Sequence, residues 1–159
     1  MLLGLAALLS MAQAYRIAIV TDMHVNPTYN ETCSTMCEDL AKYGKDPSAS
    51  LLNLILEDLA QSYDKDDDIK AILISGDLVR HGLSQKNMSA SNWDLQKPII
   101  QSVIDAVNTR FPGVPIISNI GNNDVINHYQ APNGTKKDIF YPDLYSIWFS
   151  TNPSMSSDP

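Results

Sequence analysis

The chain has 159 residues, enough for one domain with a buried core and too few for two ordinary domains. Hydrophobic residues make up 44% of it and charged residues 18%, which is typical of a globular protein. The formal net charge of -7 argues against a surface for nucleic acid or anionic membranes, because no basic stripe exists to neutralise phosphates. Any phosphate chemistry here would therefore need metal ions to supply positive charge.

An apolar block, LLGLAALLSM, follows the first methionine, and the small-x-small triplet Ala12-Gln13-Ala14 comes directly after it. This order predicts a signal peptide over residues 1–14, whose removal would leave Tyr15 as the first residue of the mature chain. Arg16 ends the block well short of the roughly 20 residues that a membrane span needs, so we expect no transmembrane span in the mature chain. The alternative is a buried first strand or helix.

Three N-glycosylation sequons begin at Asn30, Asn87 and Asn133, in segments that we expect to be loops, and they agree with export. In an oxidising compartment Cys33 and Cys37 would pair with each other, since the chain has no other cysteine. The two thiolates could instead bind a metal ion, but that reading needs two further cysteine or histidine ligands close by.

Short apolar runs rich in Ile and Val predict strands at residues 16–20, 70–75 and 114–120. Continuous apolar runs of this length are typical of strands buried on both faces, as in a parallel sheet. A dinucleotide-binding domain would also have such strands, but the G-x-G-x-x-G motif does not follow the first of them.

Helical patterns lie between and after these runs. Residues 46–63 predict a helix with Asp46 as its N-cap, and residues 93–111 predict a second, with Pro98 in its first turn or at its start. A short third helix is expected at 141–149. The apolar face of the second pattern consists of Ile99, Ile100, Val103, Ile104 and Val107. Strands that alternate with helices predict an α/β fold with a parallel βαβαβ core.

Ligands of an open α/β sheet bind beyond the carboxyl ends of its strands. The three predicted strands end in VTDMHVNP, SGDLVRHG and IGNNDVINH. The chain's only three histidines, His24, His81 and His128, all lie in these loops. Each motif alone is more often a plain turn than a functional site, but together, at successive strand ends, the motifs predict a metal site.

The residue types suit a pair of divalent ions. Asp22 and His24 are two positions apart, so their carboxylate and imidazole can bind one ion. The two oxygens of the Asp77 carboxylate can bridge both ions. Asn122 offers a neutral oxygen to the second ion. Two ions about 3.5 to 4 Å apart can bind a phosphoryl group, activate a hydroxide between them and stabilise in-line displacement. Zn, Mn and Fe all accept this ligand set.

The three loops contain, in order, D-x-H, G-D-x-x-x-H, and G-N followed by His or Asn and an acidic residue. This series resembles the motifs of calcineurin-like metallophosphoesterases, with the spacing of the acid sphingomyelinase-like branch. The resemblance implies that Asp22 and His24 hold one metal ion, Asp77 bridges, and Asn122 holds the other, with zinc favoured. It implies that the chain is the first half of a four-layer α/β/β/α sandwich, with the domain spanning residues 15–159.

The activity implied by the resemblance is hydrolysis of a phosphodiester or phosphoanhydride by a metal-bound hydroxide. The enzyme would be secreted or lie in a lysosomal or vacuolar lumen. Its substrate would be polyphosphate, a nucleotide or a phospholipid head group.

Three further residues are expected to touch the substrate. His81 matches the second-motif histidine of the family, which contacts the phosphate or protonates the leaving group. His81 is therefore our first choice as general acid. His128 is the second choice, although it could equally be a surface histidine. Most of the branch has a histidine where this chain has Asn123, which can bind a phosphoryl oxygen but cannot deliver a proton near neutral pH. The sequence GNND with a nearby histidine, and Arg80-His81, resemble the endopolyphosphatases of the superfamily.

The resemblance covers roughly residues 15 to 150. The remaining metal ligands of the family are histidines from two later motifs, one of them a G-H-x-H turn, and nothing after Asp124 matches them. We therefore expect a fragment of a longer enzyme. The alternative is a secreted glycoprotein that keeps the fold as a binding module without catalysis.

Overall fold

The computed structural model describes residues 16–29, 40–41, 45–62, 69–83 and 92–149. The predicted signal peptide, the sequons at Asn30 and Asn87, and the Cys33 and Cys37 pair lie outside these residues. The third sequon is described: Asn133 is exposed and immediately precedes a short 3-10 helix, Gly134–Lys136.

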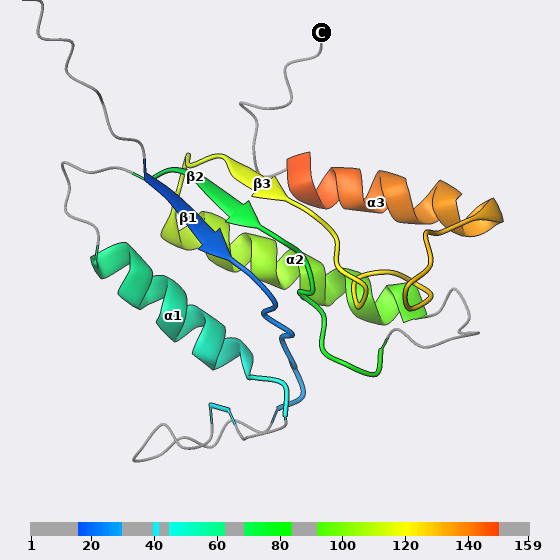
Figure 1. The fold of residues 1–159 in the computed structure, drawn as a ribbon, viewed down its shortest axis with the longest axis horizontal. Helices are drawn as coiled ribbons and strands as arrows, with labels where there is room; N and C mark the ends of the chain where they lie inside the picture. Colours follow the sequence, from blue (N-terminus) through cyan, green and yellow to red (C-terminus); the bar gives the residue numbers. More distant parts are fainter. Residues whose placement is uncertain (1–15, 30–39, 42–44, 63–68, 84–91, 150–159) are drawn as a thin grey trace, which may run out of the picture.

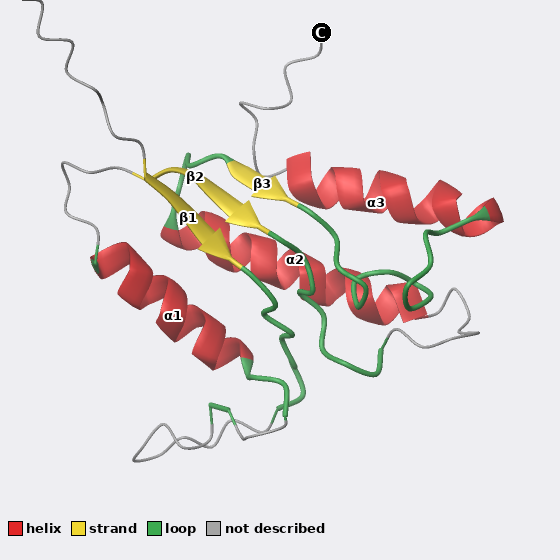
Figure 2. Ribbon diagram, viewed as in Figure 1, coloured by secondary structure: helices red, strands yellow, loops and turns green. Residues whose placement is uncertain are grey.

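The strands form one parallel sheet, as predicted, and lie in the order β1-β2-β3 (Figures 1 and 2). Their bounds are β1 Arg16–Val20, β2 Ile69–Ile74 and β3 Ile116–Ser118, so β3 is shorter than the predicted run. Ile19 pairs with Leu73, and Leu73 with Ile117, so these three side chains share one face. All three strands end at the same edge of the sheet, and the loops that carry the motifs begin there.

Helix α1 spans Ala49–Gln61 and begins later than predicted. Its N-cap is Ser48, whose hydroxyl oxygen accepts a hydrogen bond from the backbone N–H of Leu51 at 3.2 Å. The prediction that Asp46 caps this helix is therefore wrong. The Asp46 carboxylate bonds to His81 instead, on a loop that is remote in sequence.

Helix α2 spans Trp93–Arg110, and all five predicted apolar positions on its inner face are buried. Pro98 is the sixth residue of the helix and not part of its first turn, which corrects the prediction. Its side chain faces solvent, where the carbonyl left without a helical N–H partner can bond to water. Helix α3 spans Lys137–Phe149 and begins four residues earlier than expected.

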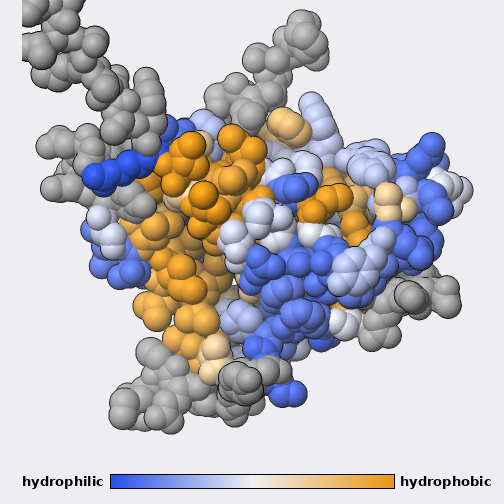
Figure 3. Space-filling view, viewed as in Figure 1, coloured by the Kyte–Doolittle hydropathy of each residue, from blue (hydrophilic) through white to orange (hydrophobic). Residues whose placement is uncertain are grey.

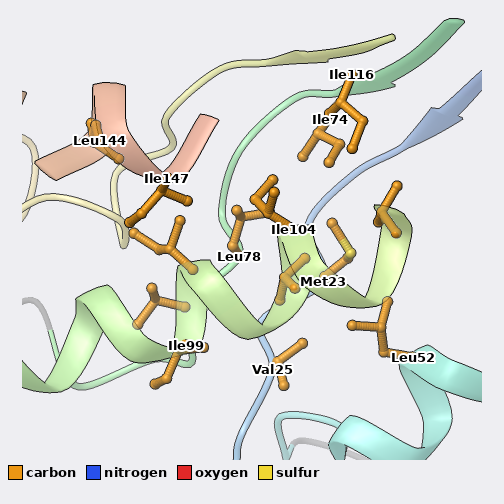
Figure 4. Close-up of a cluster of buried hydrophobic side chains, with 14 of the residues drawn as sticks. Met23, Val25, Leu52, Ile74, Leu78, Ile99, Ile104, Ile116, Leu144 and Ile147 are labelled. Atoms are coloured by element: carbon orange, nitrogen blue, oxygen red, sulfur yellow. The ribbon is translucent and has the colours of Figure 1, made fainter. Parts of the chain in front are cut away.

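The helices pack on one face of the sheet. Helix α2 contacts both α1 and α3, and the core lies between them and the sheet (Figures 1 and 4). Ile72 and Ile74 of β2 are fully buried there, together with Ile104 of α2. None of the described helices is long and apolar enough to cross a bilayer.

The other face of the sheet is open among the described residues. Ile17, Ile19 and Ile117 are 57%, 65% and 51% exposed, so the prediction that the strands are buried on both faces is wrong for this part of the chain. The cause is geometric, because the described helices all pack against the opposite face. Figure 3 shows the resulting apolar surface over the sheet, beside a hydrophilic surface over the loops at the strand ends.

A polar cluster joins α2 to α3. Trp93 Nε1 and Lys97 Nζ donate hydrogen bonds to the two oxygens of Asp143 at 2.7 and 2.8 Å. Partial burial opposes ionisation of Asp143, but the hydrogen bonds from Lys97 and Trp93 and the charge of Lys97 outweigh it and lower the pKa of this carboxyl.

We expect Asp143→Asn to lower the free energy of unfolding by about 1 kcal/mol at pH 7, since Lys97 is partly screened by solvent. Because the folded pKa is lowered, the stabilisation is present above the ordinary value of 3.8 and is lost as the pH falls through the folded value. Urea unfolding of both proteins across this range measures the effect. A difference that stays constant with pH would show that the Asp143 charge does not stabilise the helix pair.

Candidate metal centre

The loops after β1 and β2 continue side by side beyond the sheet. The backbone N–H of His24 donates to the carbonyl of Asp77 at 2.9 Å, and that of Val25 to the carbonyl of Leu78 at 2.8 Å. Val25 also forms an isolated parallel bridge with Val79. The first two motifs therefore lie against each other, as their positions at adjacent strand ends predict.

Asp22, His24 and Asp77 form a compact group whose ligand atoms all lie within 4.8 Å of one another. Each of the three has a left-handed backbone, with φ of 50°, 41° and 54°. This conformation is uncommon outside glycine and costs free energy, and such strain concentrates at functional sites. The fold thus holds two carboxylates and an imidazole together in a geometry that the backbone alone disfavours.

The imidazole of His24 has a defined orientation. Its Nδ1 lies 3.2 Å from the carbonyl oxygen of Val79. Because a carbonyl only accepts, Nδ1 must carry the proton, and the lone pair of Nε2 is left for a metal ion. A hydrogen bond from the second ring nitrogen to a carbonyl is the usual support of a metal-binding histidine.

The loop after β3 reaches this group through Asn123. Its backbone N–H and its Nδ2 donate to Asp77 Oδ1 at 2.8 and 3.3 Å, which leaves Oδ2 without a described partner. Asn123 is only 3% exposed, and its carbonyl accepts from Gln96 of α2. The structure thus places Asn123 as a support of Asp77, and its predicted contact with a phosphoryl oxygen stays a prediction.

His128 lies beside Asn122. The Nδ2 of Asn122 donates to Nε2 of His128 at 2.6 Å, so the neutral ring carries its proton on Nδ1. The amide of Asn122 turns its NH₂ group to His128, and its role as the neutral oxygen ligand stays a prediction. The ring of His128 also stacks on Tyr129 with centroids 4.2 Å apart. The geometry makes His128 a neighbour of a predicted ligand, and its role as a second general acid stays a prediction.

His81 lies next to the metal-binding group. Its ring stacks on that of His24, with centroids 4.0 Å apart and an interplanar angle of 23°. The His81 side chain is 63% exposed, so a substrate can reach it. The first-choice general acid is therefore both close to the predicted metal ligands and open to solvent.

Two glycines let the second and third loops approach. A side chain on Gly121 would overlap the backbone nitrogen and Oδ1 of Asp77. One on Gly76, whose φ is 98°, would overlap the backbone of Gly121. The glycines of the G-D and G-N motifs are needed because the two backbones touch.

Asp124 is a buried carboxylate of the third loop that sequence reasoning did not assign to the site. Its Oδ1 accepts from the backbone N–H groups of Leu78 and Val79 at 2.8 and 3.0 Å, and its Oδ2 from that of Gly121 at 2.9 Å. Burial raises the pKa of Asp124, the charge of Asp77 adds to the rise, and the three hydrogen bonds oppose it. The acidic residue after G-N-N can be recognised in the sequence. Its burial and its hydrogen bonds to three backbone N–H groups cannot, because they depend on the packing of the loops.

Comparison with known protein families gives one result. The sequence model of the calcineurin-like phosphoesterases matches residues 15–157. The chain belongs to this family. No curated protein matches it.

The ligand set of this calcineurin-like phosphoesterase fits the divalent metal ions that the family implies. Asp22, His24 and Asp77 offer two carboxylates and one imidazole with a free Nε2, a combination that binds Zn, Mn or Fe. Asn122 directly precedes Asn123, whose backbone N–H bonds to Asp77. The family and the geometry together support a metal-dependent phosphoesterase, while the narrower acid sphingomyelinase-like resemblance stays a prediction.

Proposed function

We propose that the chain hydrolyses a phosphodiester or phosphoanhydride whose phosphoryl group sits over Asp22, His24 and Asp77. The observation that carries this proposal is the clustering of these three side chains, each on a left-handed backbone at the end of a strand. A turn without a ligand has no need of two carboxylates within reach of one imidazole, because like charges repel.

The residues divide into two metal positions. Asp22, His24 through Nε2 and Asp77 would hold one ion, and Asp77 with Asn122 would hold the other. Two divalent ions, most simply zinc, would neutralise phosphoryl charge and lower the pKa of a bound water. The protein then has to hold the ligands in place. The hydrogen bond that His24 Nδ1 donates to the carbonyl of Val79 and the one that the backbone N–H of Asn123 donates to Asp77 support this.

His81 would act as the general acid that protonates the leaving oxygen. Its exposure and its stacking on His24 favour this role over His128, whose Nε2 is occupied by Asn122. Asn123 would stabilise the site through Asp77, with any contact to the phosphoryl group secondary.

We propose further that the enzyme is exported, to the outside of the cell or to a lysosomal or vacuolar lumen, and that it is similar to acid sphingomyelinases and endopolyphosphatases. The apolar block before Ala12-Gln13-Ala14 and the three sequons support export, with N-glycans at Asn30, Asn87 and Asn133. Polyphosphate, a nucleotide or a phospholipid head group would be the substrate.

The test is hydrolysis of bis(p-nitrophenyl) phosphate and of tripolyphosphate by the purified chain with Zn²⁺ or Mn²⁺, and again after EDTA. We expect turnover with metal, loss with chelator and recovery on adding metal back. Turnover that survives the chelator would refute a metal-dependent reaction. Metal binding without turnover would favour the binding module instead.

His81→Ala should lower turnover by about 10² to 10⁴-fold, the usual contribution of a general acid.

A further inference from the structure

The carboxylate of Asp46 holds His81 in two places. Its Oδ1 lies 2.6 Å from the ring Nδ1 of His81, and its Oδ2 accepts the backbone N–H of His81 at 2.9 Å. Because an ionised carboxylate only accepts, Nδ1 must donate, so Nε2 is the ring nitrogen left for a substrate. No other partner of the His81 ring nitrogens is present among the described residues.

Asp46 is itself firmly placed. The carbonyl of Pro47 accepts the backbone N–H of Asn26 at 2.9 Å, and Ser48, which is fully buried, bonds to the carbonyl of Leu40 at 3.1 Å. The bond from Asn26, and an isolated parallel bridge between Asn26 and Ser48, attach the segment before α1 to the loop that carries Asp22 and His24. The Asp46 side chain is only 17% exposed, so little solvent competes for its oxygens.

We propose that Asp46 is a positioning residue that acts through His81, fixing its ring beside His24 with Nε2 directed to the substrate. This inference rests on the proposed function, since it gives His81 the role of general acid. A flexible exposed histidine would sample several rotamers, and the two hydrogen bonds to one carboxylate restrict it to one. Removal of the outer hydrogen-bond partners of metal-binding histidines commonly lowers activity by about 10- to 100-fold, and we expect an effect of the same size at His81.

A second geometric reading is that Asp46, His81 and His24 bind a cation, because their ligand atoms also lie within 4.8 Å of one another. The short Nδ1 to Oδ1 distance favours a proton between His81 and Asp46 over a metal ion. A metal ion at His81 Nδ1 would remove that proton, so the two readings predict different spectra.

The first experiment is ¹⁵N NMR of the histidine rings of the full chain at a pH where they are neutral. The chain has three histidines, so the signals can be assigned with single His→Ala variants. We expect His81 to be the Nδ1–H tautomer in the wild type, with and without Zn²⁺, and a mixture of tautomers in Asp46→Ala. Asp46→Asn can keep its oxygen on the backbone N–H of His81 while its NH₂ group faces Nδ1, which favours the Nε2–H tautomer, so this variant serves if the alanine variant does not fold. Asp105→Ala, which removes an exposed carboxylate of α2, should leave the His81 signals unchanged.

The second experiment measures turnover in a double-mutant cycle. We expect Asp46→Ala to lower turnover by about 10- to 100-fold in the wild type and by less than about 2-fold in His81→Ala. An unchanged tautomer in the Asp46 variants, or loss of the Nδ1 proton when Zn²⁺ binds, would overturn the positioning role. An altered tautomer in a chain without any turnover would uphold the contact while refuting the proposed function.

Discussion

Asp77→Asn is expected to reduce turnover by more than about 100-fold, since removal of outer partners of metal ligands alone costs about 10- to 100-fold. The substitution removes the charge that two cations would share. It should keep the fold, because an asparagine oxygen can still accept from the backbone N–H of Asn123. Asparagine also tolerates the left-handed backbone of this position, where φ is 54°. Turnover with Mn²⁺ or Zn²⁺ and metal affinity by calorimetry measure the effect.

The choice of asparagine separates chemistry from folding. Alanine at Asp77 would add strain from the left-handed backbone and would lose the bonds from Asn123, so lost activity could reflect a disordered loop. Thermal unfolding of Asp77→Asn should lie close to that of the wild type without metal. If this variant turned over within about 3-fold of the wild type, Asp77 would not be the shared ligand, since a bridging carboxylate supplies charge to both ions.

The positions of the strands could be predicted because short apolar runs rich in Ile and Val leave a strong sequence signal. The runs at 16–20 and 70–75 became β1 and β2, and the apolar face of α2 is buried as its spacing indicates. Burial on both faces could not be predicted in the same way. Ile19 and Ile72 are the same residue type in similar runs, yet one is 65% exposed and the other fully buried, because only the placement of the helices distinguishes the two faces.

The clustering of the candidate ligands could be predicted from their positions at the strand ends, but the hydrogen bonds that support them could not. Asp22, His24 and Asp77 lie together because adjacent parallel strands end at one edge. The supporting bonds connect segments that are distant in sequence: Asp46 to His81 over 35 residues and Asp124 to Leu78 over 46. The local pattern at Asp46, an acidic residue before a helix, favoured a cap, and a tertiary hydrogen bond took its place.

The three hydrogen bonds to Asp124 lead to the largest expected loss of stability. Asp124→Ala would leave the backbone N–H groups of Leu78, Val79 and Gly121 without their acceptor at a residue that is 1% exposed. An unsatisfied buried donor costs about 1–3 kcal/mol, so we expect the free energy of unfolding to fall by about 3–5 kcal/mol. Urea unfolding at pH 7 measures it. This is a large share of the roughly 5–15 kcal/mol that stabilises a domain.

A graded series tests whether the hydrogen bonds are the cause. Asp124→Asn can keep the bonds from Leu78 and Val79 through its oxygen but turns an NH₂ group toward the N–H of Gly121, so its loss should be about 1–3 kcal/mol. Asp105→Ala, at an exposed position of α2, should change stability by less than about 0.5 kcal/mol. If the alanine and asparagine variants of Asp124 were equally stable, the fall in the free energy of unfolding would not depend on the number of unpaired backbone N–H groups. Because the same bonds join the loop of Asp77 to that of Asn122, metal affinity should fall in the same order as stability.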